Sequence, residues 1–191
     1  MSLSKRKLVI VGGVAGGMSA ATRARRLAEN WQIVVYERSG FVSYANCGLP
    51  YYVGREIEDE ASLIVQTPES LKERFNLDIK ILHEVTGINA QEKIITVTNL
   101  KTGESFAESY DELILSVGAK PIKPPLAGID LPGIFTVRSI EEIRQIDNWI
   151  TQFAERLADK TREGRPKAVV CGGGFIGIET AEQLKKRGFQ V

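Results

Sequence analysis

Short apolar runs followed by glycines mark places where a strand is expected to lead into a helix. The run 8–11 contains no polar residue, which is typical of a strand covered on both faces of its sheet. Glycines follow, then alanine and leucine at helical spacing in 18–30, and a second apolar run, 33–37, that ends on Glu37. The pattern predicts one strand–helix–strand unit over 7–37.

The pattern changes in the middle of the chain. Residues 67–75 predict a short helix that begins at Thr67, with Pro68 in its first turn. Short strand-like runs then alternate with polar turn sequences, which predicts a β-meander. The runs expected to form the strands of the meander are 79–88, 93–100 and 104–110. A further apolar strand is expected to start at Glu112 and to lead to Gly118.

A proline-rich crossover, 120–133, follows and marks a boundary. Ser139 and Glu142 then predict a capping box at the start of an amphipathic helix. Residues 167–191 repeat the order strand, glycine loop and helix, and Cys171 is expected to be a small buried residue of that strand. The apolar face of the amphipathic helix comprises Ile140, Ile143, Ile146, Ile150 and Phe153.

Composition and charge exclude several classes of protein. The 191 residues are 43% hydrophobic and 26% charged, as in a soluble globular protein. The 25 basic and 24 acidic residues give a net charge of +1 and no reason to expect a nucleic-acid or membrane partner. There is no apolar run of the roughly 18 residues that a membrane span needs, and no signal-peptide pattern. With two distant cysteines, a cytoplasmic location is expected, and a Cys47–Cys171 disulfide is disfavoured.

The first glycine loop predicts a dinucleotide site. Gly12 and Gly17 stand at the first and third positions of a GxGxxG pattern, whereas Val14 replaces the second glycine. Such a loop lets the backbone approach a pyrophosphate, and the helix that follows supplies free N–H groups. Glu37 lies at the end of the next strand, where its carboxylate can accept hydrogen bonds from a ribose. The alternative is a tight turn that binds no ligand.

The second glycine loop is a complete match. It carries Gly172, Gly174 and Gly177, and Ala181 follows. The acid that would complete this site lies beyond Val191, so the sequence leaves NADH and NADPH both open. Two such loops, with a meander in the second half of the first unit, indicate FAD together with a nicotinamide cofactor.

Four stretches together carry a family resemblance. They are VIVGGVAGGMSAATRARRL, ERSGFVSYANCGLPYYVG, YDELILSVGAKP and VVCGGGFIGIETAEQL. The chain, from residue 7 to 191, resembles the flavoprotein pyridine nucleotide-disulfide oxidoreductases, and within them the coenzyme A-disulfide reductases, NADH-dependent persulfide reductases and NADH oxidases. Members are more than twice as long, so we read the chain as the N-terminal part of a longer protein.

The resemblance implies an α/β fold. An FAD-binding Rossmann-like three-layer domain with a β-meander and the redox cysteine loop is expected over 1–119. The crossover and the beginning of an incomplete Rossmann-like NAD(P)H-binding domain are expected over 120–191. A cytoplasmic homodimer is implied for the full-length protein.

The resemblance also implies a reaction centred on Cys47. Electrons would pass from NAD(P)H through FAD and this single redox cysteine to coenzyme A disulfide or a persulfide. Two-cysteine relatives have their second cysteine five positions later, where this chain has Tyr52. A lone cysteine must store its oxidised state as a sulfenic acid or as a mixed disulfide with a small thiol. A helix start nearby favours the thiolate form of a cysteine, and Pro50 is compatible with a helix that begins at this loop. The alternatives are an NADH oxidase or peroxidase that uses a sulfenic acid, and an inactive nucleotide-binding fragment.

The resemblance assigns residues to the cofactor and substrate sites, and it implies no metal site. Phe75 stands where some members have a lysine, and Lys72 or Arg74 can substitute for it. His83 is expected to be structural. The alternative for Arg23 and Arg26 is that they only line the solvent-exposed face of their helix. FAD is assigned to Gly12, Val14, Ala15, Gly17, Glu37, Arg38, Asn46, Cys47, Val85, Ser116, Gly118 and Arg138; the nicotinamide cofactor to Gly172, Gly174 and Gly177; and coenzyme A to Ser19, Arg23, Arg26, Ser43 and Asn46.

Overall fold

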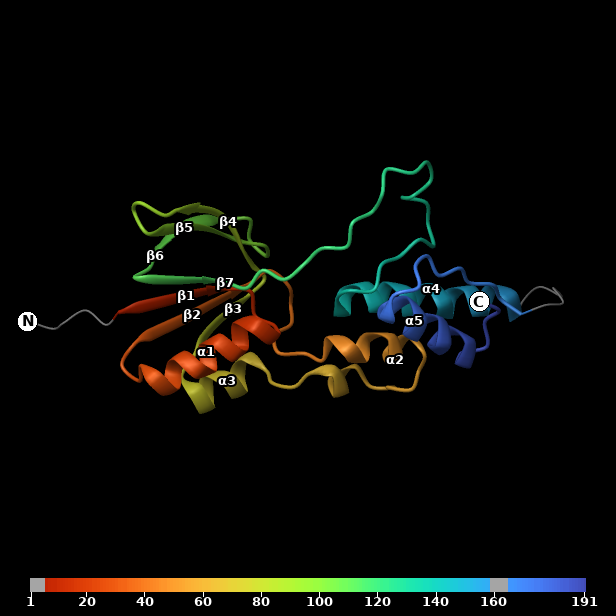
Figure 1. Ribbon diagram of the computed structural model, residues 1–191, viewed down its shortest axis with the longest axis horizontal. Coiled ribbons are helices and arrows are strands. Elements are labelled where there is room, and N and C mark those ends of the chain that lie inside the picture. Colours follow the sequence, from red (N-terminus) through yellow and green to blue (C-terminus); the bar gives the residue numbers. More distant parts are fainter. Residues whose placement is uncertain (1–5, 159–164) are drawn as a thin grey trace, which may run out of the picture. The chain divides into compact units, whose positions relative to one another are not determined.

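The structure, a computed structural model, describes residues 6–158 and 165–191, and the side chains of 153–158 lie outside the description (Figure 1). The predicted place of Phe153 therefore cannot be compared. The chain forms two compact units, each made of two segments. The first comprises the residues up to Tyr44 together with Ile64–Ala119, and the second comprises Ala45–Leu63 together with Lys120–Val191. The predicted domain limits stay a prediction. Among the described residues, no helix has the length and apolar character needed to cross a bilayer.

A parallel sheet of four strands forms the centre of the first unit. Its strand order is β3-β2-β1-β7, and every neighbouring pair is parallel. The strand–helix–strand unit predicted over 7–37 is confirmed, with α1 over Ala15–Leu27 as the connecting helix. The strands are β1 (Lys7–Val11), β2 (Gln32–Glu37), β3 (Asp78–Ile81) and β7 (Glu112–Leu115).

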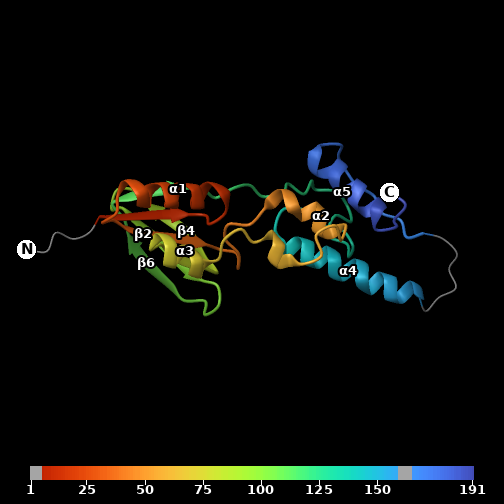
Figure 2. The same cartoon turned by 90° about the horizontal axis from the view of Figure 1, so that it is seen from below.

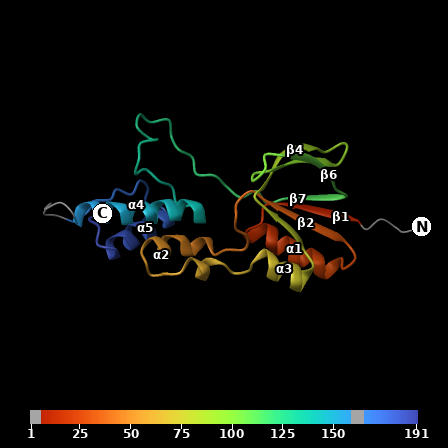
Figure 3. The same cartoon turned by 180° about the vertical axis from the view of Figure 1, so that it is seen from behind.

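Both faces of this sheet are covered, which accounts for the unbroken apolar run in β1. Leu8 and Ile10 pack beneath α1 and α3 (Pro68–Phe75), whereas Val9 lies in a second core with Val34 and Ile95. That second core lies under an antiparallel sheet, β4-β5-β6, on the opposite side from the helices (Figures 1 and 3). The first unit is thus a three-layer α/β structure, and the expectation of a doubly covered strand is confirmed.

The single strand predicted over 79–88 is wrong, because the backbone turns at Leu82. This residue has φ +56°, and it separates β3 from β4 (His83–Asn89), so the two strands join different sheets. The Leu82 N–H donates to the Ser39 carbonyl at 3.0 Å, and the Leu82 carbonyl accepts from the Leu100 N–H at 2.8 Å. The meander itself is confirmed, with β5 (Ile94–Asn99) and β6 (Ser105–Ser109) as its other strands.

The helix predicted at 67–75 is confirmed with its cap. The Thr67 hydroxyl accepts from the Ser70 N–H at 3.2 Å, and the Ser70 hydroxyl accepts from the Thr67 N–H at 3.1 Å. This reciprocal pair satisfies donors that a helix start leaves free. The His83 ring, expected to be structural, packs between two aromatic rings: its centroid lies 6.2 Å from those of Tyr36 and Phe106, and its Nδ1 lies 2.8 Å from the Ile81 carbonyl oxygen.

Arg25 joins the carboxyl-terminal ends of α1 and α3. Its guanidinium donates to the carbonyls of Phe75 at 2.8 Å, Asn76 at 2.9 Å, and Glu29 and Trp31 at 2.7 Å each. Free carbonyls at helix ends favour a cation, so this side chain satisfies both ends at once.

We expect Arg25→Met to lower the free energy of unfolding by about 2–3 kcal/mol, since it leaves several carbonyls of a partly exposed site without a donor. Urea unfolding would measure the change. Arg26→Met is the matched control, because Arg26 is exposed one residue further along the same helix. Equal stabilities of the two variants would contradict the assignment.

The second unit is helical in its described part. Figure 2 shows α2 (Leu49–Val53) between α4 (Ile140–Ala158) and α5 (Phe175–Lys186), and α2 contacts both. Short 3-10 turns, Asn46–Gly48 and Glu60–Leu63, flank α2. Half of the predicted capping box of α4 is present: the Glu142 N–H donates to the Ser139 hydroxyl at 3.3 Å, whereas the Glu142 Oε1 accepts from the Thr136 hydroxyl at 2.9 Å. The predicted apolar face is buried at Ile140, Ile143, Ile146 and Ile150.

The strand predicted before the second glycine loop does not form, and the prediction that Cys171 is buried is wrong. A strand needs the backbone of a neighbour to bond, and among the described residues the run has a single bridge, between Lys167 and Gln190. Val169 is 89% exposed, and Cys171 is exposed as well.

Candidate functional site

The first glycine loop has a shape that only glycine permits at two positions. Gly12 has φ +102°, and a Cβ placed on it would lie 2.1 Å from the Ser116 carbonyl oxygen. A Cβ on Gly17 would lie 1.7 Å from the Gly12 carbonyl oxygen. Val14, the residue before α1, offers no side-chain acceptor to the first N–H groups of the helix. This uncapped helix start behind a bare loop fits a pyrophosphate.

Glu37 is built into the same loop. It is 8% exposed; its Oε2 accepts from the Gly13 N–H at 2.7 Å, and its Oε1 accepts from the Ser39 N–H at 2.8 Å. Each carboxylate oxygen has a further lone pair with which to accept from a ribose hydroxyl. The ribose role stays a prediction, and the structure adds that Glu37 holds the glycine loop against the end of β2.

Ser43 is tied to that loop by its backbone. It has φ +47°, and its N–H donates to the Gly13 carbonyl at 2.9 Å while its carbonyl accepts from the Val65 N–H at 2.8 Å. Sequence reasoning assigned Ser43 to the substrate and missed this anchoring. Serine in a left-handed conformation is uncommon, so no local signal predicts it.

The remaining first-unit residues lie at the surface or near the loop. Ser19, Arg23 and Arg26 are exposed on α1 at intervals of four and three residues, which places them on one face.

Phe75 packs against the core, Arg74 stacks on its ring at 5.5 Å, and Lys72 is exposed. Elsewhere Ala15 and Arg38 are exposed, Val85 packs on the second core, the Ser116 N–H donates to the Val11 carbonyl, and Gly118 has φ +68°.

Cys47 stands exposed on a tightly packed base in the second unit. It lies in the 3-10 turn that leads into α2, so the prediction of a helix start just after it is confirmed. Behind it, a Cβ on Gly48 would lie 2.6 Å from the Leu63 side chain, and the Ala45 N–H donates to the Leu63 carbonyl at 2.8 Å. The Asn46 Oδ1 is buried without a hydrogen-bond partner among the described residues.

Both cysteines are free thiols. Cys47 and Cys171 are each exposed, and neither forms a disulfide, in agreement with the expectation from the sequence. Tyr52, in α2, occupies the position five residues after Cys47. Cys47 therefore has no neighbouring cysteine in sequence with which to store an oxidised state.

The second glycine loop repeats the geometry of the first. Gly172 has φ +108°, and a Cβ on Gly177 would lie 2.1 Å from the Gly172 carbonyl oxygen. Gly174 precedes α5 and offers no side-chain acceptor. The same bare loop and uncapped helix start fit a second dinucleotide. Arg138, also assigned to FAD, lies just before α4 and is partly buried.

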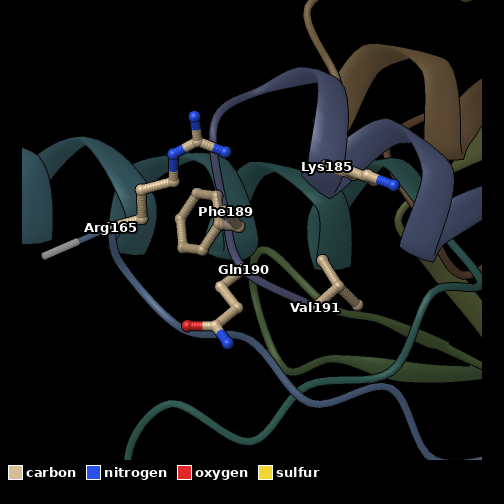
Figure 4. A pocket seen from close by; sticks show the side chains of 5 residues that line it. All are labelled: Arg165, Lys185, Phe189, Gln190 and Val191. Carbon is tan, nitrogen blue, oxygen red and sulfur yellow. The ribbon is translucent and has the colours of Figure 1, made fainter.

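One hollow of the second unit lies apart from these residues. Figure 4 shows it, with a volume of about 350 Å³, beside the last residues of the chain. None of the predicted site residues lines it, so this hollow is not part of the candidate site. Its lining residues are Arg165, Lys185, Phe189, Gln190 and Val191.

Comparison with known proteins finds relatives that match nearly the whole chain. Coenzyme A disulfide reductases of Staphylococcus haemolyticus and Staphylococcus epidermidis are each 38% identical to the chain over 97% of its length. The chain spans 39% of the length of these curated relatives.

Solved structures are similar over nearly the whole chain. Reduced Bacillus anthracis CoADR-RHD is 46% identical with a TM-score of 0.90, covering 98% of this chain and 32% of that one. An NAD-dependent persulfide reductase from A. fulgidus is 36% identical with a TM-score of 0.83, and the match covers 94% of this chain and 31% of that one. A water-forming NADH oxidase from Lactobacillus brevis is 27% identical with a TM-score of 0.80, covering 97% and 38%.

The predicted fold class is confirmed by these neighbours together with the parallel and antiparallel sheets of the first unit. The family model described as pyridine nucleotide-disulphide oxidoreductase matches residues 6–191. The chain, with its two glycine loops and its lone cysteine motif, belongs to the pyridine nucleotide-disulphide oxidoreductase family.

Proposed function

We propose that the chain is the cofactor-binding part of an NAD(P)H-dependent flavoprotein disulfide reductase whose single redox cysteine is Cys47. The observation that carries the proposal is the exposed, free Cys47 thiol on a packed turn, with Tyr52 where two-cysteine relatives have their second cysteine. The names of the coenzyme A disulfide reductases and the persulfide reductase among the relatives support a coenzyme A disulfide or a persulfide as substrate.

The glycine loops would hold the two cofactors. Gly12, Gly17 and Glu37 would bind the pyrophosphate and ribose of FAD, and the loop of Gly172 and Gly177 would bind NADH or NADPH. The chemistry that a bound flavin supplies is acceptance of a hydride and donation of two electrons to sulfur. The chain contributes bare backbone, uncapped helix starts and one buried carboxylate to these sites.

Cys47 would exchange thiols with the substrate. Its thiolate attacks one sulfur of the disulfide, the S–S bond breaks, and the first thiolate leaves and takes a proton from solvent. The other half stays on Cys47 as a mixed disulfide. Two electrons that originate from NAD(P)H then break this bond, which releases the second thiol and restores the Cys47 thiolate. One disulfide, one NAD(P)H and one proton thus give two thiols and NAD(P)⁺.

The exposed face of α1 would bind the phosphates of coenzyme A. Arg23 and Arg26 point to solvent there, whereas Arg25 is occupied by backbone carbonyls. We expect Arg23→Gln and Arg26→Gln each to raise the KM for coenzyme A disulfide about tenfold, as one lost charge-assisted hydrogen bond implies. The KM for pantethine, a disulfide that lacks these phosphates, should not change. An equal rise for both substrates would contradict phosphate recognition.

A second candidate function is that of an NADH oxidase, which the likeness to the Lactobacillus brevis enzyme favours. Cys47 would then pass through a sulfenic acid. Anaerobic NADH consumption separates the two: a disulfide reductase consumes NADH on addition of coenzyme A disulfide or a persulfide, whereas an oxidase consumes it only when oxygen is admitted. Failure of both disulfide and persulfide to support anaerobic turnover would reject the first proposal.

Assembly and location complete the proposal. We expect the full-length protein to be a cytoplasmic homodimer, as the resemblance implies, and two unpaired cysteines suit a reducing compartment. Light scattering of the full-length protein would measure its mass.

A further inference from the structure

The far end of α2, the helix that follows Cys47, is held by two arginines and one buried carboxylate. Asp147 of α4 is 8% exposed. Its Oδ2 accepts from the Arg55 Nη2 at 2.6 Å, and its Oδ1 lies 2.7 Å from the Arg187 Nη1 as an ion pair. The Arg187 Nη1 also donates to the Val53 carbonyl, at the last residue of α2, at 2.7 Å.

A second contact brings α5 against the same end of α2. A Cβ on Gly54 would lie 2.0 Å from the Gln183 Oε1, so only glycine fits between the helices. Gln183 is 1% exposed, and its Nε2 donates to the Glu56 Oε2 at 3.0 Å. Lys186 donates to the same oxygen at 2.9 Å, and these two hydrogen bonds lower the pKa of Glu56.

These contacts determine where α2 lies. At five residues, α2 is too short to be stable alone, so its position depends on tertiary packing. Cys47 precedes α2 by two residues, and the turn between them is packed against Leu63. A displacement of α2 therefore displaces the Cys47 thiol. The helix that holds α2 also begins at the second glycine loop.

We infer that Asp147 and Arg187 are positioning residues for Cys47: they fix α2, the helix that follows Cys47, against α4 and α5 and so set the position of the thiol in thiol exchange. The inference rests on the proposed function, since it concerns the reaction of that cysteine. Neither residue touches substrate or cofactor in this role. Gly54 and Gln183 form the close contact that completes the arrangement.

Asp147→Asn in the full-length protein tests this inference. The substitution keeps the size of the side chain and leaves two arginines without their carboxylate. We expect kcat for disulfide reduction to fall about tenfold or more, because small misplacements of a reacting group are costly. NAD(P)H-dependent reduction of ferricyanide, which takes electrons from flavin without Cys47, should stay within about twofold. The matched control is Glu182→Gln, which removes the same charge from an exposed α5 pair.

A steric rescue provides the second measurement. Gly54→Ala forces α2 and α5 apart and should lower disulfide reduction. Gly54→Ala combined with Gln183→Gly should recover it, because glycine at 183 removes the side-chain atoms, Cβ included, that the new Cβ meets. Alkylation of Cys47 by iodoacetamide, relative to the exposed Cys171 of the same molecule, should change at least about threefold in Asp147→Asn.

The outcomes are distinguishable. Unaltered disulfide turnover and alkylation in Asp147→Asn would overturn the inference, and so would equal losses of disulfide and ferricyanide reduction, which would indicate a general loss of folded protein. If the unmodified protein reduced ferricyanide but no disulfide or persulfide, the proposed function would fail. The alkylation ratio of Asp147→Asn would then still decide whether these residues position Cys47.

Discussion

Replacing Cys47 with serine is expected to lower kcat for disulfide reduction by about 1,000-fold or more, because serine cannot hold a substrate thiol in a mixed disulfide. The thiol is exposed, so the free energy of unfolding should change by less than about 0.5 kcal/mol. Flavin reduction by NAD(P)H should persist, since the substitution leaves both glycine loops intact.

The measurement compares two activities of one preparation. Reduction of coenzyme A disulfide should vanish in Cys47→Ser, and reduction of ferricyanide should remain. Cys171→Ser is the matched control, because it removes the other exposed thiol and should keep both activities. A Cys47→Ser protein that still reduces coenzyme A disulfide at the normal rate would exclude the thiol relay.

The second large effect is expected from alanine in the glycine loops. A Cβ on Gly17 lies 1.7 Å from the Gly12 carbonyl oxygen, a distance at which the loop must open. We expect Gly17→Ala to weaken flavin binding about 100-fold or more, because the backbone can no longer cradle the pyrophosphate. The ratio of flavin absorbance to protein in the purified variant measures this loss.

Gly177→Ala makes the same change in the second loop, where the Cβ lies 2.1 Å from the Gly172 carbonyl oxygen. This variant should purify with its flavin but fail to be reduced by NADH or NADPH, while dithionite still reduces it. If Gly177→Ala lost flavin and Gly17→Ala kept it, the assignment of FAD to the first loop and of the nicotinamide cofactor to the second would be wrong.

Elements with a local signal were predictable. Thr67 and Pro68 define a helix start in the sequence, and the structure places the cap there. The apolar run of β1 implies burial on both faces, and Val9 packs on one side of the sheet while Ile10 packs on the other. In these cases residue type and spacing determine the local structure without reference to distant segments.

Other features depend on contacts that the sequence does not reveal. Leu82 adopts a left-handed conformation because Ser39 and Leu100 bind its backbone, and leucine carries no signal for such a turn. The run before Cys171 has the composition of a buried strand, yet among the described residues its only strand bond is the bridge of Lys167 to Gln190. Composition indicates what a segment can form, and neighbours decide whether it does.

The candidate site shows the same division. The glycine spacing predicted two bare loops, and the structure adds that the first glycine of each has a positive φ. The pattern could not show that Glu37 also binds the Gly13 and Ser39 N–H groups, or that Asp147 pairs with Arg55 and Arg187 beside the end of α2. Such long-range polar contacts leave no periodic trace in a single sequence.

The central claim is that Cys47 takes its oxidation partner from solution. Mass spectrometry of the Cys47 peptide, after anaerobic incubation of the full-length protein with coenzyme A disulfide, tests it most directly. The account predicts one coenzyme A on Cys47, none on Cys171, and release of the adduct on addition of NADH or NADPH. An unmodified Cys47 in protein that turns over coenzyme A disulfide, or a disulfide joining Cys47 to Cys171, would contradict it.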